Sequence, residues 1–168
     1  MNETINAIKQ LRLQLDGLGQ LVHDLRLCHP GDFSENSAEV TLAETDVFFA
    51  KGWCGQLLSQ LGQKTPYKND GKRKGIKDIE PADDHISEFE DEASYGDKNH
   101  IQKVDWLRQA IGVHKGQVLQ WSMSPHTFVI NQHALWCVQQ IWIRLTDARM
   151  SLGFELQRIS EKAEKKST

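Results

Sequence analysis

"INAIKQLRLQLDGLGQLVHDLRL", residues 5–27, is the stretch that decides the fold. Its apolar residues recur at alternating steps of three and four, which is typical of a helix that packs against another helix. This seam consists of Ile8, Leu11, Leu15, Leu18, Val22 and Leu25. The spacing predicts a long amphipathic helix here, and further helices wherever it returns.

A second helix is predicted within "AEVTLAETDVFFAKGWCGQLLSQLG", residues 38–62. Pro30-Gly31 stops the first helix, "DFSE" at 32–35 has the form of a capping box, and Gly62 is a plausible C-terminal cap. The predicted seam is Ala43, Val47, Ala50, Cys54, Leu57 or Leu58, and Leu61, widened by Leu42, Phe49 and Trp53. Two helices joined by one short turn form an antiparallel hairpin.

The same spacing returns later in the chain. A third predicted helix begins near His100, and each position of its seam follows its counterpart in the first helix by 96 residues. That seam is Val104, Leu107, Ile111, His114, Val118 and Trp121, and Arg12 coincides with Arg108 in the same frame. A fourth helix is predicted from about Thr127 to Glu164, with Ile141, Leu145, Ala148, Leu152, Leu156 and Ile159 on one face.

These repeats predict an all-α fold, a duplicated antiparallel helical hairpin with four main helices. The fourth helix matches the seam of the second by a shift of 98, whereas Thr45-Asp46 and Gly52-Trp53 match Thr146-Asp147 and Gly153-Phe154 by a shift of 101. The alternative to duplication is that unrelated amphipathic helices share a heptad frame. The expected division is a first hairpin at 1–63, a charged insert at 64–99 and a second hairpin at 100–168.

The insert at 64–99 has no apolar period and joins a basic block to an acidic one. Lysines and Arg73 gather between Lys68 and Lys77, and nine acids follow between Asp78 and Asp97. A loop of this length is usually functional or disordered, although "DDHISEFEDEA" could form a short helix.

Composition narrows the classes of partner. The net charge is −3 and 26% of the residues are charged, so no global field attracts extended nucleic acid or an anionic membrane. The three cysteines form no C-x-x-C pair, which favours reduced, packing thiols. Without a signal sequence or a transmembrane run, the expected location is the cytoplasm, which would be that of an infected host cell if a phage encodes the chain.

The sequence has no complete catalytic signature. The histidines form no metal-binding spacing, no nucleophile elbow or phosphate loop occurs, and neither a catalytic residue, a metal nor a cofactor is expected. Carboxylates leave one alternative open, because MazG-like nucleotide pyrophosphohydrolases hold magnesium with E-x-x-E and E-x-x-D pairs. Glu44, Asp46, Glu88 and Asp91 are the acids concerned, although the first helix lacks the facing E-x-x-E.

The basic part of the insert is the main candidate for binding. It combines an aromatic ring with several phosphate donors, a set that suits a small nucleotide-like anion better than a duplex. The candidate ligand-binding residues are Tyr67, Lys68, Asn69, Lys72, Arg73 and Lys74, with Arg12 and Arg108 as helical candidates. A solvated loop without a ligand is the alternative interpretation.

Self-association is expected from the apolar surplus of the later helices. "FVINQHALWCVQQIWIRL", residues 128–145, has apolar side chains on almost every side. A helix of that kind is buried on several sides, which commonly marks a subunit interface.

"VTLAETDVFFAKGWCGQLLSQLGQKTPY", residues 40–67, resembles the second helix of small phage proteins that sequester the cyclic nucleotides made by CBASS and Thoeris defence systems. Leu42-Ala43 matches the "LA" at the start of that helix, and Gly52-Trp53 matches its small and aromatic positions. The Pro66-Tyr67 and 79–84 segments are similar as well. The resemblance extends over about residues 5–84 and loosely over the second hairpin. This chain departs from the family in having two hairpins and a long insert.

The resemblance implies an oligomeric helical sponge. Such a protein binds a cyclic di- or trinucleotide, or a cyclised ADP-ribose, between subunits without cleaving it, and suppresses anti-phage defence. The alternatives are the magnesium-dependent pyrophosphohydrolase and a helical inhibitor that binds a protein.

Overall fold

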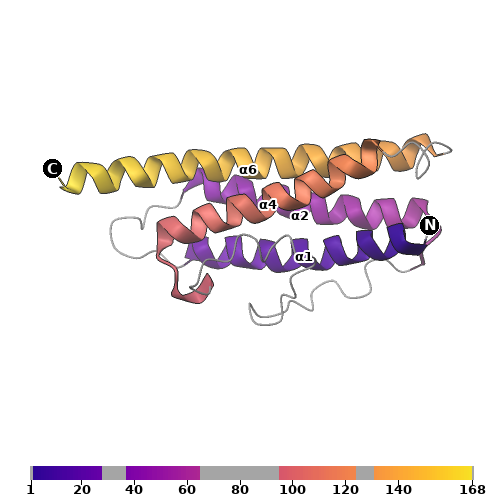
Figure 1. Cartoon of the computed structure of the whole chain (residues 1–168), viewed down its shortest axis with the longest axis horizontal. Coiled ribbons are helices and arrows are strands. Elements are labelled where there is room, and N and C mark those ends of the chain that lie inside the picture. The colour runs from indigo at the N-terminus through magenta and orange to yellow at the C-terminus, as the bar shows by residue number, and fades with distance from the viewer. Residues whose placement is uncertain (1, 28–36, 65–94, 124–130, 168) are drawn as a thin grey trace.

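The computed structural model describes residues 2–27, 37–64, 95–123 and 131–167. The described residues form four long helices, drawn in Figure 1, and none of them lies in a strand. The helices are α1 (Asn2–Leu27), α2 (Ala38–Gln60), α4 (His100–Met123) and α6 (Gln132–Ser167), with a short 3-10 turn, η3 (Tyr95–Asp97), before α4. The all-α prediction is therefore confirmed, while the charged insert falls mostly outside the described residues.

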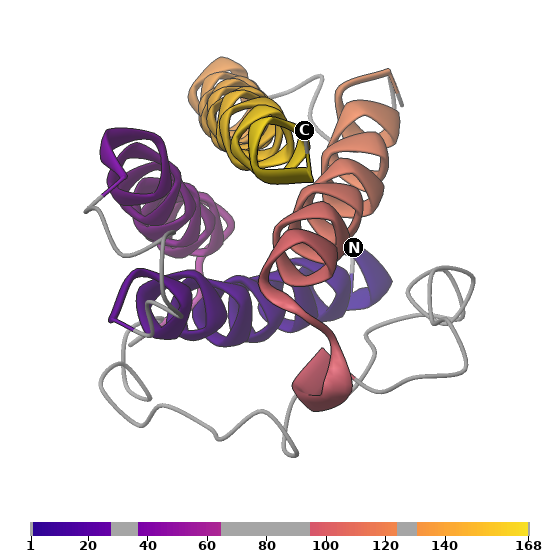
Figure 2. The same cartoon turned by 90° about the vertical axis from the view of Figure 1, so that its left-hand side faces the viewer.

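The helices form a bundle in which neighbours run in opposite directions. Figure 1 shows α1 antiparallel to α2 and α4 antiparallel to α6, and Figure 2, seen along the bundle, shows α2 beside α6 and α4 beside α1. The most extensive contact between elements joins α2 to α6, the second helices of the two hairpins. None of the described helices is both long and apolar enough to cross a membrane.

Burial follows the predicted seams and selects the register between the two hairpins. The first-hairpin seam predicted on α1 is buried at all six positions, and its counterparts on α4 are buried from Val104 to Val118. On α2 and α6, residues 98 apart are buried together: Val40 with Val138, Ala43 with Ile141, Val47 with Leu145, Ala50 with Ala148, Cys54 with Leu152, and Leu57 with Glu155. The shift of 98 is therefore the structural register, and the match at 101 is a local likeness of sequence only.

An ion pair marks the local two-fold relation between the hairpins. Asp46 Oδ1 accepts a hydrogen bond from Arg144 Nη1 at 3.1 Å, and these two residues are 98 positions apart. In antiparallel helices, equivalent positions meet only where the relating axis passes, so the axis lies beside this pair. Burial raises the pKa of Asp46, the hydrogen bond from Arg144 opposes that rise, and the nearby charge of Asp147 adds to it.

Helix ends agree with the prediction in one case and differ in two. Gly62 has φ +82°, and its N–H bonds to Ser59 O at 3.0 Å, so the predicted glycine cap is confirmed. The N-cap of α2 is Ser37, whose hydroxyl accepts from Val40 N at 3.1 Å, rather than the box at 32–35. The described part of the fourth helix begins at Gln132, five residues after the predicted start, and residues 124–130 lie outside the description.

One prediction about the core is wrong. Leu42 and Phe49 were expected to widen the buried seam of α2, but both side chains are about half exposed. They lie on the side of α2 that neither α1 nor the core covers. Trp53 is partly buried, because its ring packs edge-on against Trp136 of α6 with centroids 4.9 Å apart.

Candidate functional site

The structure separates the predicted binding residues into two groups. Tyr67, Lys68, Asn69, Lys72, Arg73 and Lys74 lie outside the described residues, as do Glu88 and Asp91, so their roles remain predictions. Arg12 and Arg108 are described, and they occupy equivalent positions of α1 and α4. They are not brought together, because Arg12 belongs to the first hairpin and Arg108 packs beside Gly153 within the second.

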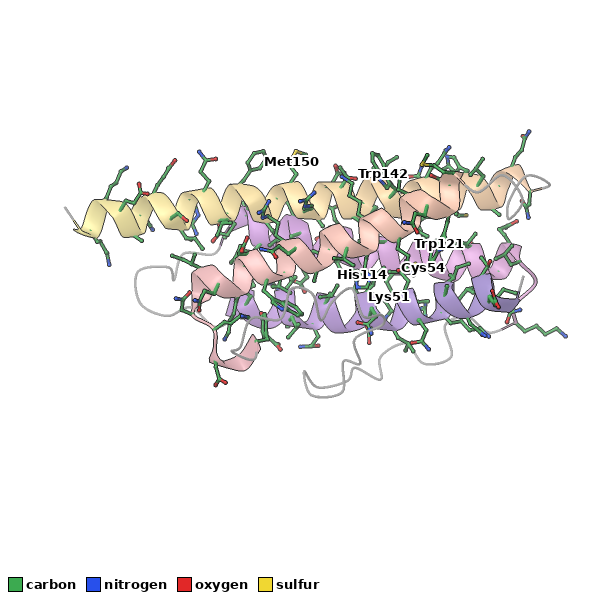
Figure 3. All side chains as sticks on the ribbon, viewed as in Figure 1. Lys51, Cys54, His114, Trp121, Trp142 and Met150 are labelled. Carbon is green, nitrogen blue, oxygen red and sulfur yellow. The ribbon has the colours of Figure 1, made fainter. Side chains whose placement is uncertain are left out.

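Arg12 lies inside the first hairpin, where its side chain is only 7% exposed. Its positive charge acts on Cys54 of α2: burial raises the pKa of that thiol to about 12, and the guanidinium of Arg12 opposes the rise. In Figure 3, Cys54 and His114 lie between the helices. A buried position suits a role in the core better than contact with a soluble ligand, which weakens Arg12 as a ligand-binding candidate.

Along the edge between α1 and α2, charges of opposite sign neutralise one another. Lys51 Nζ donates to Asp16 Oδ1 at 2.7 Å. His23 Nδ1 lies 2.7 Å from Glu44 Oε1, and Arg26 Nε lies 3.1 Å from Glu44 Oε2. The Asp16–Lys51 and His23–Glu44 pairs fit one antiparallel register of the two helices: His23 is seven residues after Asp16 on α1, and Glu44 is seven residues before Lys51 on α2. The first hairpin therefore offers little uncompensated charge along this edge.

A shallow cleft opens over these ion pairs. It has an empty volume of about 260 Å³, and its lining consists of Leu15, Asp16, Gly19, Gln20, Glu44, Phe48 and Lys51. Ligand pockets usually measure roughly 300–1,000 Å³. The cleft is therefore too small for a nucleotide, and its charged groups already have partners.

The second hairpin changes this arrangement at the equivalent positions. The shift of 98 takes Lys51 to Arg149, and the shift of 96 takes Asp16 to Gly112. Arg149 still faces its counterpart on α4: a Cβ added at Gly112 would lie 3.1 Å from Arg149 Nε. Glycine has replaced the acid, so no carboxylate of the described residues pairs with the exposed guanidinium of Arg149.

Arg108 and Lys115 of α4 lie along the same edge as Arg149. Arg108 Nη2 makes a long contact of 3.4 Å to Asp105 Oδ1 on its own helix. Lys115 Nζ lies 5.1 Å from the ring centroid of Trp142 on α6. We call Arg108, Lys115 and Arg149, together with Trp142, the α4–α6 basic cluster.

Two donors of the basic cluster have no acceptor. Arg108 Nε and Trp142 Nε1 are buried, and neither has a hydrogen-bond partner among the described residues. A buried donor left without an acceptor costs roughly 1–3 kcal/mol, so such groups are uncommon unless a ligand, an ion or water satisfies them. The cluster thus joins three positive charges, of which Asp105 offsets one, to two buried donors without a described acceptor.

Sequence reasoning named Arg108 but missed Lys115, Trp142 and Arg149. In the sequence, Lys115 and Arg149 look like ordinary charged residues on a helix surface, and Trp142 looks like an ordinary core residue. The available signal was the shift of 98 applied to Lys51, but its meaning depends on knowing that Asp16 neutralises Lys51.

Of the four acids that could hold magnesium, the structure describes Glu44 and Asp46, and these two do not face each other. Glu44 faces α1, where it pairs with His23 and Arg26, whereas Asp46 faces α6 and pairs with Arg144. Within the described ranges, no three or more His, Cys, Asp or Glu side chains gather where they could hold a metal ion. Glu44 and Asp46 therefore do not form a shared magnesium site.

The chain was compared with models of protein families, with curated proteins and with solved structures, and none of them matches it.

Proposed function

We propose that this protein binds and sequesters a phosphorylated nucleotide signal without cleaving it. The ligand class is a cyclic di- or trinucleotide or a cyclised ADP-ribose, and sequestration would suppress a host anti-phage defence in the cytoplasm. The proposal keeps the function implied by the sequence resemblance and moves the described part of the site to the second hairpin.

The α4–α6 basic cluster is the observation that supports this proposal. Arg108, Lys115 and Arg149 bring three positive charges to one edge, and Asp105 is the acid that contacts one of them. Arginine can fork onto a phosphate and lysine supplies a point charge, while Trp142 adds a ring beside them. The buried donors of Arg108 and Trp142 lie at opposite ends of this edge, so two phosphate groups of one ligand would be needed to supply an acceptor to each of them.

The chemistry of the cluster favours a compact anion that is bound and not cleaved. The chain has a net charge of −3, so attraction to a long polyanion is weak outside this edge. Pyrophosphohydrolysis would need carboxylates that hold magnesium, and the described acids Glu44 and Asp46 point to different neighbours.

Calorimetry with a panel of cyclic di- and trinucleotides and cyclised ADP-ribose tests the proposal. We expect one of them to bind at micromolar protein, and mass spectrometry should recover it intact after heat denaturation. Failure of every ligand to bind would reject sequestration. Release of a cleaved product in the presence of magnesium would instead support the enzyme.

The glycine that replaces the acid in the second hairpin allows a sharp prediction. Gly112→Asp places a carboxylate beside Arg149, as Asp16 lies beside Lys51 in the first hairpin. The affinity for the nucleotide should fall about tenfold, because the carboxylate competes with phosphate for Arg149. Affinity is measured by calorimetry.

Gly52→Asp is the matched control. It adds the same charge on α2, outside the basic cluster, where a new Cβ has no neighbour within 4 Å, and should leave affinity within about twofold. Equal losses in the two variants would show that general charge, and not neutralisation of Arg149, governs binding.

A further inference from the structure

An apolar surface covers the outer side of α2 and α6. We call it the α2–α6 apolar face, and it consists of Leu42, Phe49 and Trp53 on α2 with Trp136, Ile143, Met150 and Phe154 on α6. The Trp53–Trp136 contact and the guanidinium of Arg144, 4.5 Å above the ring of Phe49, join the two helices across it. In Figure 3, Met150 projects from the outer side of α6, away from the core.

The spacing of this face is that of a helix that meets another helix. Trp136, Ile143 and Met150 follow one another at seven-residue intervals on α6, and Leu42 and Phe49 do the same on α2. A heptad stripe is the pattern of helix–helix packing. The inner seams of α2 and α6 are already buried in the bundle, so the outer stripes are left to meet a helix from outside it.

The most exposed positions of this face carry almost no charge. Every exposed position of α2 between Thr41 and Gln60 is uncharged, namely Thr41, Leu42, Thr45, Phe48, Phe49, Gln56, Ser59 and Gln60. On α6, Arg149 is the one charged residue among the exposed positions from 136 to 154, and it points toward α4. An interface between two identical chains places the same patch against itself. Arg144, whose side chain is 35% exposed, lies between the two helices of this face and pairs with Asp46. A patch of unpaired like charges would repel its own copy, whereas the charge of Arg144 is offset within the chain.

The size of the face matches that of a dimer. Its side chains are on average about half exposed, and a ring of Phe or Trp offers roughly 150–250 Å² when fully exposed. The exposed apolar area is therefore on the order of 500 Å² for each copy. A standard interface buries about 800 Å² for each partner, of which about 56–65% is apolar, so the expected apolar share is about 450–520 Å².

We propose that the α2–α6 apolar face binds a second copy of this chain around a two-fold axis that passes beside Ile143. With α6 antiparallel to the partner's α6, Ile143 meets its own counterpart and Trp136 lies opposite Met150 of the second copy. A thioether beside an aromatic ring is a favourable contact. The α4–α6 basic cluster lies on another edge of α6 and stays accessible, and this dimer does not depend on the identity of the ligand.

Sedimentation velocity across a concentration series tests the interface. The parent chain should be a dimer at micromolar concentration, and Ile143→Lys, which places two cations against each other at the axis, should raise the dimer dissociation constant at least a hundredfold. Leu13→Lys is the matched control, since Leu13 is 43% exposed on α1 and Ile143 is 41% exposed. Leu13→Lys should leave the dimer unchanged.

A second measurement keeps the inference falsifiable if Ile143→Lys fails to fold. In a Cys28→Ser background, Ile143→Cys should form an intermolecular disulfide on mild oxidation, because the axis brings the two thiols together, while Leu13→Cys should not. A monomeric parent chain overturns the inference. So does a dimer that survives Ile143→Lys, or a face that associates only with a different protein.

Discussion

The double variant Arg108→Ala/Arg149→Ala should bind the nucleotide identified by calorimetry about a thousandfold more weakly than the parent chain. Each hydrogen bond between a charged donor and a phosphate contributes roughly 1.5–3 kcal/mol, so losing both arginines should cost about 4 kcal/mol, and every 1.4 kcal/mol is tenfold in affinity. Neither arginine carries a strong internal ion pair, since Arg108 has one 3.4 Å contact to Asp105 and Arg149 has no described carboxylate partner. The folded bundle should therefore keep its stability.

Calorimetry measures this loss, and circular dichroism checks that the double variant remains helical. Lys9→Ala is the control, because Lys9 is an exposed cation on α1 and does not belong to the α4–α6 basic cluster. Binding that falls less than tenfold in the double variant would move the site away from the second hairpin. The basic segment at 68–77 would then be the remaining candidate.

Arg158→Leu should lower the free energy of unfolding by about 3 kcal/mol. Glu155 is 1% exposed, and Arg158 donates to both of its oxygens, from Nε at 3.0 Å and from Nη2 at 2.8 Å. Ser37 Oγ donates to the same carboxylate at 2.6 Å. Without Arg158 a buried carboxylate keeps a single hydroxyl as partner, and breaking a buried ion pair costs roughly 3–5 kcal/mol. Because Arg158 is partly exposed, we expect the loss of stability to lie at the lower end of that range.

The double variant Arg158→Leu/Glu155→Leu separates this effect from loss of packing. The position equivalent to Glu155 in the first hairpin is Leu57, a fully buried residue, so leucine suits the seam at 155. We expect the double variant to recover most of the lost stability, because a buried ion pair is often replaced by apolar residues at little cost. Urea unfolding at one fixed protein concentration measures both variants. A double variant less stable than Arg158→Leu would show that Glu155 is held mainly by Ser37 and not by its charge partner.

Helices and seams followed from the sequence alone. The three-four spacing from Ile8 to Leu25 and its return after 96 residues are local properties of the chain, and the period of an α-helix fixes which side chains share a face. The glycine cap at Gly62 was equally local, because a positive φ at a helix end favours glycine. The burial of Cys54 and His114 also followed from their places in the seams.

Which face of α2 stays exposed was decided by the tertiary structure. Leu42 and Phe49 are as apolar as the buried seam, and only the positions of α1 and α6 around α2 show that nothing described covers them. The choice between the shifts of 98 and 101 had the same origin, because both fit the sequence and only packing selects the register.

The candidate site shows the same division. The sequence by itself placed Arg12 and Arg108 in equivalent frames, but it could not show that one is buried beside Cys54 and the other lies on a basic edge. Charge neutralisation depends on which residue faces which across two helices: Asp16 faces Lys51, whereas Gly112 faces Arg149. The period of a helix depends on residues close together in the sequence. The partner of a charged side chain depends on contacts between segments far apart in the sequence, and these contacts exist only once the bundle has formed.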